Sequence, residues 1–252
     1  MSSGLPTVLR VTRTKVQAKE SYDRMSPFYD CFAGLFEQKY RNMALKRLNI
    51  ARGEIVLEIG FGTGHCLKQM AEAVGDEGRV YGIDISSSVI VTSKRRLEKA
   101  GLWNRVELVC DDAMGIPFMD NRFDAVFSSF ALELFDSPEI PEVLAEVRRV
   151  LRPGGRIGII GMSREGEASP LLKLYEWLHQ KLPQYVDCRP IFVEQSMKDV
   201  DFGIQSSERV SLMGLPGEIV IGIKPSKLET PRQARATVSI GSHMAKGKGL
   251  VV

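Results

Sequence analysis

Three closely spaced glycines and two acidic residues are the part of the sequence best suited to chemistry. The stretch "LEIGFGTGH" places Glu58 two residues before the glycines Gly60, Gly62 and Gly64, and Asp84 follows 20 residues after the last of them. Glycines let a backbone approach a ligand closely and adopt positive φ without steric cost. An acid at this distance past a glycine turn can accept hydrogen bonds from two ribose hydroxyls. The spacing therefore predicts a site for a ligand that contains adenosine.

The glycine spacing and Glu58 favour one adenosine cofactor over another. Dinucleotide sites use G-x-G-x-x-G, whereas the third glycine here comes one residue earlier. A carboxylate would repel a pyrophosphate but attract the amino group and sulfonium of S-adenosylmethionine. We predict that Glu58 holds the ammonium group, and that the turn 60–64, including Phe61 and Thr63, makes room for the methionine part. An NAD-dependent Rossmann oxidoreductase is the disfavoured alternative.

Further cofactor-binding positions follow the later strands. Asp112 could accept a hydrogen bond from the exocyclic amine of adenine, and Ala113 could offer its backbone amide. Ile85, which follows Asp84, is included in the predicted cofactor site. Ser128 ends the fourth predicted strand and would border both cofactor and substrate. Asp111 is more simply explained as a cap or a solvated side chain.

A catalytic base is required only if the acceptor must lose a proton during methyl transfer. His65 is the candidate, because it begins the first helix, where the positive helix end lowers the pKa of a histidine. The alternative is that His65 only lines the pocket. Glu133 could face the acceptor, but an ordinary helix-start carboxylate is the simpler explanation. We expect His179 and His243 to be solvated.

The elements that position these residues alternate between strand and helix. This order predicts an α/β fold of right-handed βαβ units, with a doubly wound sheet covered by helices on both faces. Two further helices and a closing hairpin at 204–225 would add an antiparallel strand, giving a Rossmann-like, mostly parallel, seven-stranded sheet. The expected strands are 55–60, 78–86, 105–110, 123–130 and 152–163, and the expected helices are 63–75, 87–101, 138–151, 168–182 and 191–200.

Composition and charge limit the class of protein. The 252 residues carry a net charge of +3, but residues 1–20 and 227–252 account for +3 and +4, which leaves −4 for the segment between them. The acidic body argues against nucleic-acid binding. The four cysteines are scattered and predict neither a metal site nor disulfides. Without a long apolar run, we expect no transmembrane segment and a cytoplasmic location.

Taken together, the motifs resemble those of the class I S-adenosylmethionine-dependent methyltransferases over about 54–162. They are "LEIGFGTGH", "YGIDIS", "DDAMGIPF", "FDAVFSSF" and "LRPGGRIGI". Within that class, "YDRMSPFYD" near the N-terminus, "KYR" at 39–41 and the terminal "GIKP" are similar to the ubiquinone/menaquinone-biosynthesis C-methyltransferase family (methyltransferase domain type 11). The resemblance implies a lid of N-terminal helices over the cofactor, with Tyr29 near the methionine carboxylate.

The resemblance implies a single methyltransferase domain over 20–225. It would comprise a helical lid (20–50), a cofactor-binding core (51–162), substrate-side helices (163–203) and the closing hairpin (204–225). Segments 1–19 and 226–252 are expected to be flexible or disordered. The expected reaction moves a methyl group from S-adenosylmethionine to a small aromatic or lipophilic acceptor, by quinol-like C-methylation or by O-methylation, and leaves S-adenosylhomocysteine.

Apolar side chains of 163–191 favour such an acceptor, and a lipophilic acceptor would also allow peripheral membrane contact. A module that binds S-adenosylmethionine without catalysis is the alternative from another class of protein. The sequence leaves the acceptor and the oligomeric state open.

Overall fold

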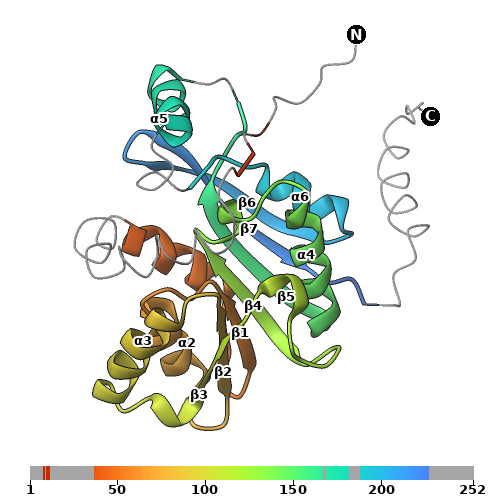
Figure 1. Cartoon of the computed structure of the whole chain (residues 1–252). Helices are drawn as coiled ribbons and strands as arrows, with labels where there is room; N and C mark the ends of the chain where they lie inside the picture. Colours follow the sequence, from red (N-terminus) through yellow and green to blue (C-terminus); the bar gives the residue numbers. More distant parts are fainter. Residues whose placement is uncertain (1–7, 9, 12–36, 167–168, 182–187, 227–252) are drawn as a thin grey trace, which may run out of the picture.

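Seven strands form one sheet in the order β3-β2-β1-β4-β5-β7-β6 (Figure 1). The computed structural model describes residues 8, 10–11, 37–166, 169–181 and 188–226. Strands β1 to β5 pair in parallel, whereas β7 is antiparallel to both β5 and β6. This confirms the predicted sheet. The strands are β1 (Ile55–Ile59), β2 (Arg79–Asp84), β3 (Val106–Cys110), β4 (Phe123–Ser129), β5 (Leu151–Met162), β6 (Gly203–Leu212) and β7 (Leu215–Ile223).

The order of the strands creates a switch point between β1 and β4. From β1 the chain moves outward to β2 and β3, and it then returns to the other side of β1 with β4. The loops after β1 and β4 therefore leave the sheet in opposite directions. In doubly wound sheets, this divergence opens a crevice at the carboxyl ends of the strands.

Helices cover both faces of the sheet (Figure 1). Helices α2 (His65–Val74) and α3 (Ser87–Lys99), with a helix over 37–48, pack on one face, and α4 (Glu139–Val150) and α6 (Val193–Asp199) pack on the other. Helix α5 (Pro170–Lys181) lies beyond the end of β5. Short 3-10 helices are η1 (Trp103–Arg105), η2 (Ala113–Gly115) and η3 (Leu132–Leu134). Among the described residues, none of the helices combines the length and apolar character needed to cross a bilayer.

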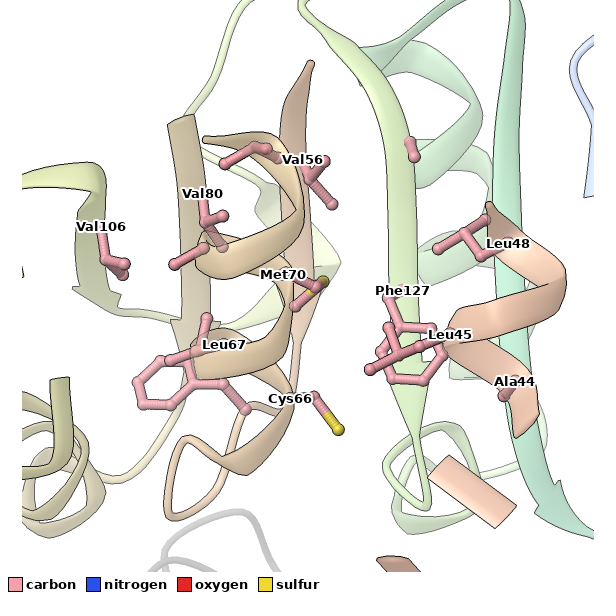
Figure 2. Packing of buried hydrophobic residues seen from close by; sticks show 14 of the residues in the cluster. Ala44, Leu45, Leu48, Val56, Cys66, Leu67, Met70, Val80, Val106 and Phe127 are labelled. Atoms are coloured by element: carbon pink, nitrogen blue, oxygen red, sulfur yellow. The ribbon is translucent and has the colours of Figure 1, made fainter. Parts of the chain in front are cut away.

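The first core forms because apolar positions recur at the period of each element. Helix α2 buries Cys66, Leu67 and Met70 on one face, against Val56 of β1 and neighbouring strand residues (Figure 2). Figure 2 also shows Leu45 and Leu48 of helix 37–48 packing beside Phe127 of β4. Successive residues of a strand point to opposite faces. Val56 and Glu58 therefore face α2, while their neighbours in β1 face α4.

The second core lies under α4 and α6. Helix α4 buries Ile140, Val143, Leu144, Val147 and Val150, the stripe expected of a helix with one face on a sheet. Strands β1 and β4 are buried on both faces, as the apolar runs of a parallel sheet require. The two cores together hold the carboxyl ends of β1 and β4 rigidly beside each other.

The closing hairpin differs in detail from its prediction. The stretch "GLPG" at 214–217 predicts a short Gly-Pro turn between the two strands, but β7 already begins at Leu215. The turn consists of Met213 and Gly214, whose φ angles are 54° and 89°. A two-residue turn with both φ values positive matches the right-handed twist of the strands it joins, which is why it prevails over the longer turn.

Several sequence predictions concern residues outside the described ranges. They concern most of the N-terminal segment and lid (1–7, 9 and 12–36), which includes Tyr29, and the tail from 227 onward, which includes His243.

Candidate functional site

The glycine turn after β1 is shaped by close contacts as well as by its backbone conformation. Gly60 has a φ of 67°, and a Cβ atom built on it would lie 2.3 Å from the Cβ of Ala131, in the loop after β4. Any side chain at position 60 would thus collide with that loop. At Gly64, an added Cβ would lie 2.7 Å from Oγ of Ser93. The turn is therefore closely packed against two neighbouring segments.

Two side chains from outside the turn hold it in place. Asp84, at the end of β2, accepts hydrogen bonds of 3.0 Å from the backbone amides of Gly62 and Ser86, one on each carboxylate oxygen. The hydroxyl of Ser93, fully buried on α3, donates to the carbonyl oxygen of Gly62 over 2.9 Å. A carboxylate has about four lone-pair sites, so Asp84 retains the capacity to accept from a ligand. Nothing in its local sequence pattern singles out Ser93.

A pocket of about 110 Å³ opens at the carboxyl ends of β1 and β2, at the switch point. Its lining includes five of the predicted cofactor-binding residues, namely Gly60, Asp84, Ile85, Asp112 and Ala113. Asp111, for which a cap or solvation was the simpler explanation, lines the pocket too. The remaining predicted residues, Glu58, Phe61, Gly62, Thr63, Gly64 and Ser128, and the candidate base His65, are not part of this lining.

The loop after β4 supplies pocket residues that the sequence prediction missed. These are Ala131, Leu134, Phe135 and Glu139. The order of the strands could have identified them, because the loops after both strands at a switch point border the crevice. With Asp84, Asp111 and Asp112, Glu139 makes the rim of the pocket strongly acidic, which favours a cationic ligand over a phosphate.

Two arginines anchor this loop. The fully buried Arg189 donates to the carbonyl oxygen of Phe135 and, over 3.2 Å, to the hydroxyl of Ser137. Arg10 donates from two nitrogens to Asp136, at distances between 2.6 and 2.9 Å, and holds the pKa of that carboxyl well below its usual range. The arginines thereby fix the backbone from which Phe135 reaches the pocket.

Glu58 is buried and only partly satisfied. Its side chain is 2% exposed, and its carboxylate is hydrogen-bonded to the thiol of Cys66 and the backbone amide of Leu67. Its other oxygen, Oε2, has no hydrogen-bond partner. Burial raises the pKa of this carboxyl well above its ordinary value, against the opposing field of Arg41. A buried acceptor without a donor is costly, so this position suits a cationic ligand group.

Arg41, on helix 37–48, is the cation whose charge opposes the rise in the pKa of Glu58. It donates to the hydroxyl of Ser129 over 3.1 Å, forms an ion pair with Glu37, and lies 5.9 Å from the ring centre of Phe130. Phe130 has a φ of 53°, a conformation that is uncommon for an aromatic residue. Such backbone strain gathers at functional sites. At the end of β4, the guanidinium of Arg41 thus lies beside the strained backbone of Phe130.

Ser128 is a second buried group that lacks a partner. It is 4% exposed, and no hydrogen bond is formed by its Oγ. In the parallel register it pairs with Ile59, so both side chains leave the sheet on the same face. Since Ile59 lines the pocket, Ser128 lies on the pocket side of the sheet beneath it.

His65, Glu133 and His179 lie in different surroundings. His65 is half-buried as the first residue of α2. Glu133 lies in the first turn of the short helix η3, as expected of a helix-start carboxylate, and its side chain is fully buried. It accepts from the amide of Met162 over 3.4 Å and packs above Gly161, where an added Cβ would lie 2.2 Å from its Oε2. The expectation that His179 is solvated was wrong, because it is 6% exposed on the inner side of α5.

Comparison of the sequence with protein families identifies residues 56–155 as a match to a family described as "Methyltransferase domain". Among curated relatives, the chain is 34% identical over 159 residues to a demethylmenaquinone methyltransferase of Listeria welshimeri, which covers 61% of this chain and 66% of that protein. It is 36% identical over 146 residues to the protein of the same name from Geobacillus stearothermophilus, covering 58% and 60%. The chain thus matches less than two thirds of the length of either relative.

Solved structures share the fold. The (4+2)-cyclase SpnF has a TM-score of 0.68 at 19% identity, over 87% of this chain and 99% of that one. A SAM dependent methyltransferase from Aquifex aeolicus has a TM-score of 0.55 at 24% identity, over 73% and 88%. The fold is therefore that of the class I methyltransferases, and it also serves a protein described as a cyclase, so the chemistry has to be argued from the site.

Proposed function

We propose that this chain, which carries a class I methyltransferase domain and resembles the demethylmenaquinone methyltransferases, transfers a methyl group from S-adenosylmethionine to a small lipophilic or aromatic acceptor. The observation that carries the proposal is the buried carboxylate of Glu58, whose Oε2 has no partner, two residues before the glycine turn. A dinucleotide would bring its negatively charged pyrophosphate to this place. The ammonium group of a cationic cofactor would instead give Oε2 of Glu58 a hydrogen-bond donor.

Residues that line the pocket, and Glu58 just before the glycine turn, fit the parts of this cofactor. Glu58 would hold the ammonium group, and Asp84 would accept hydrogen bonds from the ribose hydroxyls while keeping its bonds to the turn. Asp112 and Ala113 would hold the adenine, since both line the pocket at the end of β3. When bound, the cofactor supplies an activated methyl group on a sulfonium, so the protein has mainly to position it and to exclude water.

Arg41 adds a charge that the sequence reasoning did not assign. The methionine part carries a carboxylate as well as an ammonium group, and a guanidinium is well suited to binding a carboxylate. Arg41 lies at the end of β4, and its field reaches Glu58. We propose that Glu58 and Arg41 together bind the amino-acid end of the cofactor, each supplying the charge opposite to one of its groups.

The acceptor would lie beyond the end of β4, near Ser129 and Phe130, where Arg41 reaches the strand. The named activity of the relatives favours a quinol-like ring as the acceptor. Transfer forms a bond from a carbon or oxygen of the acceptor to the methyl group and releases S-adenosylhomocysteine and a proton. His65 remains the proposed base for that proton, although a phenol-like acceptor needs little assistance.

A second candidate function is a module that binds the cofactor without transferring its methyl group. It is favoured by the likeness to a cyclase, because that protein shares the fold over 99% of its length. In this case the pocket would still bind the cofactor, but no acceptor would be methylated.

Isothermal titration calorimetry separates these possibilities. We expect S-adenosylhomocysteine to bind and NADH to give no heat of binding. Binding of NADH instead would refute the cofactor assignment. The second candidate would be supported if S-adenosylhomocysteine binds but no methyl group is transferred. The acceptors tested for transfer are reduced demethylated naphthoquinones and the compounds of a host extract.

A further inference from the structure

Helix α5 turns large apolar side chains toward solvent. Leu171, Leu174 and Trp177 have exposed fractions of 45%, 52% and 53%. Spacings of three residues place them on one side of the helix. Isolated exposed apolar residues are common on proteins, but a row of them on one helix face indicates contact with another apolar surface.

The opposite side of α5 is largely polar, although it faces the protein. His179 is 6% exposed there, and the hydroxyl of Tyr175 donates to the carbonyl oxygen of Cys188 over 3.1 Å. Glu176 forms an ion pair with Arg164 at 3.1 Å, and both side chains are mostly buried. Leu172 is the buried apolar residue of the helix. A surface helix normally has the reverse arrangement, so burial in this domain does not account for the apolar face of α5.

The turn of the closing hairpin extends this apolar face. Met213, in the turn between β6 and β7, is 72% exposed. The next residue, Gly214, faces α5, since a Cβ built on it would lie 3.1 Å from Cδ2 of Leu171. Leu171, Leu174, Trp177 and Met213 therefore belong to one surface, here called the α5–hairpin patch.

The patch lies at the same end of the sheet as the cofactor pocket. Met162, the last residue of β5, pairs with Gly217 of β7, so the hairpin turn extends beyond the carboxyl end of β5. Figure 1 shows α5 and the hairpin turn past the arrowheads of β4 and β5. The pocket opens at the carboxyl ends of neighbouring strands. A surface docked on the patch would therefore lie near the acceptor side of the site.

The charges around the patch indicate which apolar surface it fits. Lys173 and Lys181 are exposed on α5, whereas the acid of the same helix, Glu176, is bound to Arg164. Leucines and a tryptophan flanked by lysines are typical of helices that lie in the interface of a membrane. Lysines near such a face are attracted to anionic lipids. Charge complementarity thus favours an anionic lipid surface over a second, similarly charged copy of the patch.

We propose that the α5–hairpin patch docks on the surface of a lipid bilayer that contains anionic lipid, with Trp177 inserted at the level of the headgroups. Docking there brings the acceptor side of the site close to lipid. Delivery of a lipophilic acceptor rests on the proposed function, whereas docking itself does not.

The fluorescence of Trp177 tests the contact directly. The chain has two tryptophans, so the Trp103→Phe variant reports on Trp177 alone. Vesicles of phosphatidylcholine and phosphatidylglycerol, with and without brominated acyl chains, are added to this full-length variant. We expect a blue shift of the emission with plain vesicles and quenching with brominated ones. Emission that is unaffected by either kind of vesicle would overturn the proposal.

Vesicle sedimentation with matched variants tests the patch as a surface. The Leu174→Ser/Trp177→Ser variant is expected to reduce the vesicle-bound fraction at least tenfold. The control, Met119→Ser, changes a residue that is 74% exposed in the loop before β4, at the opposite end of the sheet, and should bind as the wild type does. An equal loss of vesicle binding in both variants would overturn the proposal. The proposal would also be overturned if the wild type does not bind vesicles but forms a dimer that the double variant does not form.

Titration of S-adenosylhomocysteine keeps this inference separate from the proposed function. If the protein binds S-adenosylhomocysteine but does not sediment with the vesicles, the membrane proposal alone is overturned. If it sediments with the vesicles but does not bind S-adenosylhomocysteine, the proposed function alone is overturned.

Discussion

Replacing Glu58 with glutamine is expected to move stability and cofactor affinity in opposite directions. The side chain is 2% exposed, its Oε2 has no partner, and burial raises the pKa of its carboxyl well above the ordinary value. Glutamine has nearly the same shape, and its oxygen can still accept from the Cys66 thiol and the Leu67 amide. The substitution thus removes the buried charge and little else.

The expected gain in stability depends on pH. Because the pKa of Glu58 is higher in the folded than in the unfolded state, the folded state binds the proton more tightly. The contribution of this proton to stability is therefore complete below the unfolded value and is lost as pH rises through the raised pKa. Above that range the wild type carries an incompletely satisfied buried charge, and we expect Glu58→Gln to raise the free energy of unfolding by about 1–3 kcal/mol.

The expected loss of affinity comes from the same charge. A hydrogen bond to a charged group contributes about 1.5–3 kcal/mol, so Glu58→Gln should raise the Kd for S-adenosylhomocysteine by a factor of roughly 10–150. In the wild type, the affinity should increase as pH rises through the raised pKa, because the ligand's ammonium group binds the ionised carboxylate. Binding should then release a proton, which appears as a dependence of the calorimetric heat on the buffer.

Urea denaturation over a series of pH values, with calorimetry at the same pH values, measures both effects. A residue that serves only the fold would lower stability when changed and leave affinity alone. If Glu58→Gln binds S-adenosylhomocysteine as tightly as the wild type, or if it is less stable than the wild type above the raised pKa, the assignment of the ammonium group to Glu58 is wrong.

Three further predictions follow from individual contacts. Asp84→Ala should weaken binding of S-adenosylhomocysteine by about 1–3 kcal/mol in calorimetry, because the ribose hydroxyls lose their acceptor, and unchanged affinity would count against that role. Gly60→Ala should lower the free energy of unfolding by about 2–4 kcal/mol in denaturant titrations, since its Cβ would lie 2.3 Å from that of Ala131 in a backbone at φ 67°. Gly62→Ala is the matched control, with φ 49° and no atom within 4 Å, and should cost only about 1–2 kcal/mol; an equal cost would refute the clash. Burial raises the pKa of Glu218 to about 7. The free energy of unfolding should therefore fall as pH rises through that value, and Glu218→Gln should flatten this dependence in denaturation at pH 6 and pH 8; a dependence as steep as in the wild type would refute the assignment.

The elements around the site could be predicted because their signals are local. Alternating strands and amphipathic helices repeat within a few residues, so the period of the apolar side chains identified β1, α2 and α4. The pairing of the glycine turn with Asp84 was also accessible, since both follow strands that adjoin in a parallel sheet. The structure joins them through a hydrogen bond from Gly62.

The rest of the site depends on contacts between segments far apart in the sequence. Ser93 supports the turn from α3, and Arg41 reaches β4 over a separation of 88 residues. Arg189 is fully buried although arginine is rarely so, and nothing in its neighbourhood predicts the loop it anchors. The same limit explains the error at His179, because its burial depends on how α5 packs rather than on the pattern within α5.

Methyl transfer itself tests the central claim most directly. The full chain is incubated with S-adenosylmethionine that carries a trideuterated methyl group, together with a lipid extract of the organism that encodes it, and the products are analysed by mass spectrometry. We predict that a lipophilic compound gains the deuterated methyl group, and that Asp84→Ala reduces its formation. The account would be contradicted if the protein binds S-adenosylhomocysteine and yet no compound of the extract becomes labelled.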